Sequence, residues 1–189
     1  MHDSQTKVEY FIQEAYTPEE RLNMLAFRHS RLVPTIAQYM EKHDIAEKEV
    51  AVEELARAWL DGKNTERRHQ FYATWCVDSP GRSISTELEI IGSVDAEMMA
   101  DPLPMDGHDN DAIKLELKNL RVHESARRKG VGRALVSAVQ QCAEQVAQPS
   151  TVYLEVDSDN AGAISLYQQM GFAPVDPANS NRLIWSSVH

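Results

Sequence analysis

A short basic segment with two glycines is the part of this sequence with the clearest potential for chemistry. It runs from Arg127 to Arg133, between a stretch of alternating apolar and polar residues and a stretch with apolar residues at helical spacing. The pattern predicts a loop that opens directly into a helix. Backbone N–H groups at a helix start carry partial positive charge, and glycine lets an anion approach the main chain closely. The segment therefore predicts a site for phosphate groups.

Two other kinds of phosphate site fit this segment poorly. A Rossmann fingerprint needs a third glycine where Leu135 stands, and a P-loop needs a Gly-Lys-Ser/Thr sequence that the segment lacks. A nucleotide-binding oxidoreductase would also need a three-strand βαβαβ unit before the segment, which the pattern there does not indicate. Taken alone, the segment is also compatible with a plain helix entry that carries surface bases.

A second segment, NAGAISLYQQMGF at 160–172, follows at a fitting distance. Together with the Arg-x-x-Gly-x-Gly pattern at 127–132, it resembles the GNAT superfamily of acyl-CoA-dependent N-acyltransferases. The close resemblance covers about residues 113–175, and the elements before it agree only in their order. It implies a GNAT-like α/β (α+β) fold: a mixed, mostly antiparallel sheet of about seven strands, flanked by helices and splayed between the fourth and fifth strands.

The resemblance implies acetyl-CoA as the cosubstrate. Its pyrophosphate would be held by backbone amides between Arg128 and Arg133, with the neighbouring bases adding attraction. Its pantetheine arm would pair with the strand that ends at Leu120–Val122, as an added strand does. The implied cofactor-binding residues are Leu120, Val122, Arg127, Arg128, Lys129, Gly130, Val131, Gly132, Arg133, Asn160 and Tyr167.

Three residues are implied to act in the transfer itself. A bulge at 117–119 would direct the backbone N–H of Leu120 at the thioester carbonyl, where it would stabilise the oxyanion. Glu116 lies eleven residues before Arg127, where several family members carry a base that takes the proton of the incoming ammonium. Tyr167 stands where the family usually presents a phenol to the departing thiolate.

Each of these roles has a structural alternative. By strand alternation Glu116 shares a side with Lys114 and Lys118, so it also fits an outward-facing charged ladder. Tyr167 lies three residues from both Ile164 and Met170, so it also fits a packed aromatic.

Other polar residues have more limited expectations. Asn160 is expected to cap a helix start or to contact pantetheine, and these roles are compatible. Asp157 and Asp159 are candidates for orienting the acceptor. The histidines and the two cysteines show no metal-ligand spacing, so no metal is expected. Cys142 shares a helical stripe with apolar residues and is expected to be a buried, reduced thiol.

The first half of the chain predicts strands and helices in the order that such a site needs. A strand is expected around 8–12, a helix after the capping-box sequence at Thr17, and a helix near Pro34. A further helix is expected to place Ala51, Leu55, Ala58 and Trp59 on one face and to end at Gly62. Strands are expected over 69–77, before a Ser-Pro-Gly turn, and over 88–94. The stretch from 95 to 111 holds six acids and no base, and predicts an exposed acidic connection.

The second half alternates strands and helices. We expect a strand over 113–122, a helix over 130–146, a strand over 151–157, a helix over 161–170 and a strand over 182–188. A chain of 189 residues with 42% apolar and 25% charged residues fits a single domain. That domain spans 1–189, with an acceptor-side half at 1–112 and an acyl-CoA-binding half at 113–189.

Charge is divided unevenly between the two halves. The formal net charge is −10, which argues against nucleic acid and anionic membranes as partners. Residues 1–112 carry 11 basic and 22 acidic side chains, whereas 113–189 carry 8 and 7. The acid-rich stretches at 41–54 and 95–111 therefore suggest a cationic acceptor. No signal peptide or membrane span is visible, so the cytoplasm is the expected location.

The leading hypothesis is an acyl-CoA-dependent N-acetyltransferase that moves an acetyl group to a primary amine by direct attack in a ternary complex. The acceptor would be a small molecule or a peptide. The alternative is an acyl-CoA-binding regulatory module with a GNAT-like fold and little catalysis, which would not require Glu116 or Tyr167. The apolar run Leu183–Trp185 fits either a homodimer contact or a buried central strand.

Overall fold

A mixed sheet with the strand order β1-β2-β3-β4-β5-β7-β6 forms the centre of the computed structural model. The structure describes residues 10–30, 32–60, 68–75, 89–99, 113–145, 150–175 and 182–188. Neighbouring strands are antiparallel except β4 and β5, which are parallel. The strands are β1 Tyr10–Glu14, β2 Arg68–Trp75, β3 Ile90–Met98, β4 Ile113–Val122, β5 Ser150–Asp157, β6 Ala173–Pro174 and β7 Arg182–Val188. The predicted mixed sheet is confirmed, and the two-residue β6 is an addition to it.

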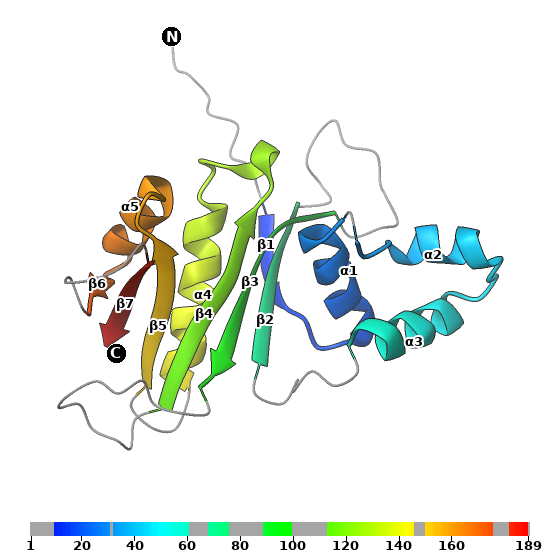
Figure 1. The fold of residues 1–189 in the computed structure, drawn as a ribbon, viewed down its shortest axis with the longest axis horizontal. Coiled ribbons are helices and arrows are strands. Elements are labelled where there is room, and N and C mark those ends of the chain that lie inside the picture. The colour runs from blue at the N-terminus through cyan, green and yellow to red at the C-terminus, as the bar shows by residue number, and fades with distance from the viewer. Residues whose placement is uncertain are drawn as a thin grey trace, which may run out of the picture.

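The helices lie on both sides of this sheet (Figure 1). They are α1 Pro18–Arg28, α2 Ile36–His43, α3 Lys48–Trp59, α4 Val131–Gln145 and α5 Ala161–Gln169, with a 3-10 turn, η2, at Glu124–Ala126. Figure 1 shows α2 and α3 at one end of the molecule and α5 at the opposite end. The acidic side chains of α2 and α3 are therefore remote from the elements that carry the second predicted motif.

The predicted helix start at Thr17 is confirmed in detail. The Thr17 hydroxyl accepts a hydrogen bond from the Glu20 N–H at 3.2 Å, and the Glu20 carboxylate accepts one from the Thr17 N–H at 2.9 Å. The same reciprocal arrangement joins Thr35 and Gln38 at the start of α2. Each box satisfies two of the backbone donors that a helix start leaves free.

The buried face of α3 differs from the prediction. Ala51 and Leu55 are buried against α1 and α2, but Ala58 and Trp59 are exposed. The apolar contacts of α3 lie instead on the side of the helix that carries Leu60. The helix ends at Trp59, before Gly62, which lies outside the described residues.

The expectation that the strand ending at 94 gives way to an exposed acidic connection at residue 95 is wrong. β3 continues to Met98, and the side chain of Asp95 has no exposed surface. A guanidinium from α1, that of Arg28, lies 2.8 Å from the Asp95 carboxylate and makes its burial tolerable. Residues 100–111 of that connection and the predicted turn at 79–81 lie outside the described residues.

The main core lies between the sheet and α4. Leu135, Val136 and Val139 of α4 pack against apolar residues of the central strands, including Leu115 and Leu154. Gly92 marks the tightest approach, since a Cβ there would lie 3.0 Å from atoms of both Leu135 and Val131. This packing holds the start of α4 against the strands that carry the predicted site.

Candidate active site

The central strands β4 and β5 separate beside the predicted site. Their parallel pairing ends at Leu117 opposite Leu154, while β4 runs on to Val122 and β5 to Asp157. On its other edge, β4 changes register with β3 between the pairs Ser93–Arg121 and Asp95–Lys118, so β4 contains one extra residue. The predicted splay is confirmed, and the extra residue lies at 119–120, at the end of the predicted bulge.

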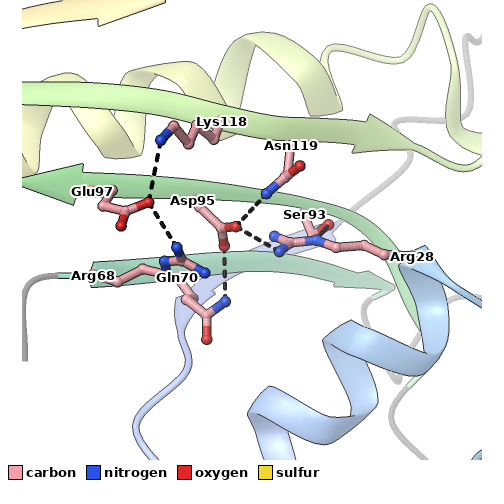
Figure 2. Close-up of polar contacts among 8 residues, drawn as sticks. All are labelled: Arg28, Arg68, Gln70, Ser93, Asp95, Glu97, Lys118 and Asn119. Atoms are coloured by element: carbon pink, nitrogen blue, oxygen red, sulfur yellow. Dashed lines mark hydrogen bonds and ion pairs between the residues drawn. The ribbon is translucent and has the colours of Figure 1, made fainter. Parts of the chain in front are cut away.

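The geometry of the bulge is carried by Asn119. Its φ of 55° lies in the left-handed region, which asparagine tolerates better than most residues. The Asn119 side chain donates a 2.8 Å hydrogen bond to Asp95 (Figure 2). Sequence reasoning missed this contact and the Arg28–Asp95 pair behind it. The available signal was the polar alternation of Ser93, Asp95 and Glu97, which continues the strand.

Glu116 lies in a charged ladder across three strands. Its Oε2 is 2.7 Å from Lys118 Nζ, which lies 3.5 Å from Glu97, and Glu97 pairs with Arg68 at 2.7 Å. Figure 2 shows the part of this ladder on β2, β3 and β4 that involves Arg68, Glu97 and Lys118. Partial burial opposes the charge on Lys118, but its hydrogen bonds and attraction to Glu116 and Glu97 outweigh this and raise its pKa. Only part of the predicted ladder is present: Lys118 pairs with Glu116, but Lys114 is buried. The Glu116 side chain is 21% exposed.

The basic segment forms a tight turn into α4. Arg128 and Gly130 have φ values of 63° and 85°, and the Ala134 N–H donates a helical hydrogen bond to the Gly130 carbonyl at 3.0 Å. The N–H groups of the first helical turn precede that bond and have no acceptor within the helix. Arg127, Arg128, Lys129 and Arg133 are exposed around this turn. The arrangement suits a bound anion.

Two of the predicted phosphate-binding arginines also have structural contacts. Arg133 donates to the Gln169 side chain at 2.6 Å, which ties α4 to α5, and Arg127 donates to the Val122 carbonyl at 3.4 Å. A Cβ on Gly132 would lie 3.4 Å from Leu166 and 3.7 Å from Val122. Gly132 thus lies where the start of α4, the end of β4 and the middle of α5 meet.

Residues of α5 complete this region. Asn160 caps the helix as predicted, because its side chain accepts a 3.1 Å hydrogen bond from the Ala163 N–H. Tyr167 is only 5% exposed and packs edge-on against Phe172, with ring centroids 5.8 Å apart. Burial raises the pKa of Tyr167 to about 12, so its phenol is protonated at neutral pH. The packed-aromatic arrangement is present, and the phenol keeps the proton that a donor needs.

The structure thus brings the predicted residues together around the separated strands. Leu120 and Val122 lie on the part of β4 that is not paired with β5, the basic turn lies at the start of α4, and Tyr167 lies on α5. A strand edge without a partner on one side can pair with an extended chain, and the turn can hold phosphates. These features fit an acyl-CoA.

Within the described residues, no group of three or more His, Cys, Asp or Glu side chains is placed to hold a metal ion. In the same part of the chain, no helix has the length and apolarity needed to cross a membrane.

Known proteins resemble this chain in part of its sequence and in its fold. The acetyltransferase (GNAT) family model matches residues 48–172. Over 57 residues the chain is 40% identical to an N-alpha-acetyltransferase of Sulfurisphaera tokodaii, a match that covers 30% of this chain and 34% of that relative. The chain therefore spans about a third of the length of the curated relative it matches.

Two solved structures illustrate the shared fold. Arabidopsis thaliana NAA60 in complex with acetyl-CoA superposes with a TM-score of 0.62 at 20% identity, covering 95% of this chain and 98% of that one. The ribosomal-protein-S18-alanine N-acetyltransferase from Escherichia coli superposes with a TM-score of 0.55 at 17% identity, covering 95% and 94%. With the family match over most of its length, the chain belongs to the GNAT acetyltransferase family.

Proposed function

We propose that this protein transfers the acetyl group of acetyl-CoA to a primary amine. The observation that carries the proposal is the separation of β4 from β5 after Leu117, directly beside the anion-binding turn at the start of α4. A thioester arm needs an extended backbone partner, and its pyrophosphate needs a cluster of N–H groups. The family match and the acetyl-CoA complex of a protein with the same fold support this proposal.

The proposed binding roles follow from these positions. Backbone amides from Arg128 to Arg133, including those of Gly130, Val131 and Gly132, hold the pyrophosphate. Arg127, Arg128 and Lys129 attract it by charge. The main chain at Leu120 and Val122 pairs with pantetheine, and Asn160 lies at its α5 side.

The proposed reaction is a direct attack in a ternary complex. The amine nitrogen bonds to the thioester carbonyl carbon and the C–S bond breaks. The attacking nitrogen then loses its extra proton, which neutralises the departing thiolate, so the products are an amide and the CoA thiol. Glu116 takes the proton of the ammonium before attack, directly or through water. The Leu120 N–H stabilises the negative oxygen that forms on the carbonyl.

Tyr167 serves the departing sulfur in this scheme. A free thiol has a pKa near 8.5, well below the value of about 12 for the buried phenol. Full proton transfer to the thiolate is therefore uphill in the free enzyme. We assign to Tyr167 a hydrogen bond that stabilises the thiolate as it leaves. The phenol proton shifts only partly toward the sulfur, because the thiolate is the weaker base.

The acceptor is proposed to be a cationic primary amine, such as the N-terminal amine of a peptide or a small-molecule amine. The N-alpha-acetyltransferase of Sulfurisphaera tokodaii supports the peptide choice. Of the acidic stretches, the one on α2 and α3 lies at the far end of the molecule from α5 in Figure 1, and Asp95 is fully occupied inside the sheet. Glu116 is an acidic residue of β4, the strand that borders the opening, and its side chain is partly exposed.

An amine panel with acetyl-CoA tests the proposal, with free CoA thiol as the readout. The panel holds peptides with free and blocked N-termini, lysine side-chain peptides, polyamines and aminoglycosides. We expect thiol release that depends on one amine class and that falls in Tyr167→Phe but not in the distant Tyr39→Phe. A protein that binds CoA and releases no thiol with any amine is instead the regulatory module.

A further inference from the structure

We infer that Asp95, held in place by Arg28, is a positioning residue for acetyl transfer: through Asn119 it fixes the β4 bulge that turns the Leu120 N–H toward the opening between β4 and β5. The inference rests on the proposed function, because it concerns the group that would stabilise the oxyanion. Neither Arg28 nor Asp95 is near enough in sequence to the predicted site to have suggested this role.

Asp95 is the buried centre of a polar cluster whose outermost member is the exposed Asn119. Its Oδ2 accepts hydrogen bonds of 2.8 Å from both Arg28 Nη1 and Asn119 Nδ2, and its Oδ1 accepts one of 2.9 Å from Gln70 Nε2. The Arg28 Nε donates to Ser93 Oγ at 2.8 Å. The side chains of Arg28 and Asp95 are 3% and 0% exposed. Figure 2 shows these donors converging on Asp95 from α1, β2 and β4.

Backbone hydrogen bonds show what the bulge does to β4. The Lys114 carbonyl accepts from the Met99 N–H at 2.9 Å, so the backbone groups of Lys114 face the β3 side. In a regular strand these groups alternate sides, so even-numbered residues through 120 would face β3. Beyond the bulge, however, the His123 N–H donates to Ile91 of β3 at 2.8 Å, so odd-numbered residues face β3 there.

The extra residue therefore reverses the direction of the Leu120 N–H. Without it, this N–H would face β3; with it, the N–H faces the side where β4 has separated from β5. Two residues of β4, Asn119 and Leu120, lie opposite the single position of Val94. The bulge must be held at this place, because an extra residue that moved along β4 toward Val122 would turn the Leu120 N–H back.

The side chain of Asn119 provides that hold. Its left-handed backbone conformation is one that non-glycine residues adopt rarely, and its amide reaches a carboxylate that cannot move. Asp95 is fixed because three elements donate to it and because its charge is paired inside the sheet. A buried ion pair often adds little net stability to a fold. The Arg28–Asp95 pair is therefore explained by the geometry that it imposes on the bulge.

Two variants separate positioning from folding. Asn119→Gly keeps a residue that adopts positive φ freely but removes the contact with Asp95. Arg28→Met/Asp95→Leu removes the buried charges together and fills the space with apolar atoms. Thermal unfolding reports the cost of leaving the buried Gln70 amide without its acceptor. Asp44→Gly is the matched control, because Asp44 also has a left-handed backbone, with φ of 54°, but ends α2.

The test measures kcat, KM for acetyl-CoA, CoA affinity and thermal unfolding for these variants. Loss of a whole oxyanion donor lowers kcat by about 10²–10³-fold, so loss of its fixed direction is expected to lower kcat by roughly tenfold or more. KM and CoA affinity should stay within about twofold, because the contact forms in the transition state. A folded Asn119→Gly with the kcat of wild type and of Asp44→Gly overturns the inference.

Amide hydrogen exchange followed by NMR keeps the inference separate from the proposed function. In the wild type, the Leu120 N–H should exchange quickly and the Arg121 N–H slowly, and protection should move toward Leu120 in Asn119→Gly and in the double variant. If the wild type releases no thiol with any amine, the proposed function fails and this exchange pattern alone decides the inference. An unchanged pattern in both folded variants overturns it.

Discussion

The ammonium of Lys118 lies 2.7 Å from the Glu116 carboxylate, so the residue proposed as the base already has a cationic partner on one of its oxygens. Lys118 is held in turn by Glu97, and its raised pKa keeps it charged at neutral pH. The residue proposed as the base is thus also a member of the charged ladder that runs through Lys118 and Glu97. Glu116 can still accept a proton through its other carboxylate oxygen.

Substitution within this ladder distinguishes the two roles. Glu116→Gln keeps the shape of the side chain but removes its basicity, so kcat/KM should fall by about 10²–10⁴-fold, as for loss of a general base. Glu97→Gln is the matched change one strand away, and it should leave kcat/KM within about threefold. Steady-state kinetics at several pH values measures both. Equal losses in the two variants would show that the ladder acts only as structure.

Binding of CoA at the α4 turn should depend on charge. Arg128→Gln removes an exposed cation from the turn, so CoA affinity should fall by roughly threefold to tenfold at low salt. The difference from wild type should shrink as salt is added, because screening weakens the attraction. Calorimetric titration at several NaCl concentrations measures this, with Arg57→Gln on α3 as the control. A loss in Arg128→Gln that does not change with salt would contradict an electrostatic role.

Tyr167 is expected to combine packing with hydrogen bonding to the leaving sulfur. Tyr167→Phe keeps the packing against Phe172 and should lower kcat by about 10²-fold with little loss of stability. Tyr167→Ala should also lose about 3–5 kcal/mol of unfolding free energy, because the ring belongs to the main core. Denaturant titration and kinetics separate the two effects. Full activity in Tyr167→Phe would reduce the residue to a packing role.

The ionisation of His69 makes the stability of the fold depend on pH. The Cys142 sulfur and the Glu14 carboxylate, which lies 2.7 Å from the His69 ring, raise the pKa of His69 to about 9 against the opposing effect of burial. Since the ordinary value is 6.5, the protonated ring favours the folded state. This stabilisation is complete below pH 6.5 and is lost as pH rises through 9.

Thermal unfolding of wild type and Glu14→Gln at pH 6 and pH 10 checks this expectation. The wild type should lose more Tm across the interval than the variant, because the variant lacks one of the contacts that favour the protonated ring. Glu41→Gln, at an exposed position on α2, serves as the matched control for loss of a carboxylate. Parallel pH profiles for wild type and Glu14→Gln would show that this contact does not contribute.

Local patterns predicted the elements of the acyl-CoA half closely. The strand at 113–122 has the predicted ends, and the strand at 150–157 and the helices at 131–145 and 161–169 differ from the prediction by a residue or so. Alternation and capping are properties of neighbouring residues, so they can be found along the chain. The resemblance to a known family supplied the splay and the roles of Glu116 and Tyr167.

The features that the sequence did not reveal depend on contacts between residues that are far apart in the chain. An acidic residue such as Asp95 predicts a solvent-exposed position. The sequence does not show that its partner Arg28, far away on α1, reaches it inside the fold. Cys142 is likewise partly exposed, because its side of α4 lines a pocket with Glu14 and His69 from β1 and β2, whereas a stripe of apolar neighbours predicted burial. Contacts between distant segments depend on the whole fold.

The central claim is that this protein makes an amide from acetyl-CoA and an amine. Its most direct test uses acetyl-CoA with an isotopically labelled acetyl group and the best amine of the panel. Mass spectrometry of the acceptor and the release of free thiol are then followed together. We expect one labelled acetyl group on the acceptor nitrogen for each thiol released, with both rates lowered in Glu116→Gln. Thiol release without labelled acceptor, or labelling that does not need the folded protein, would contradict the claim.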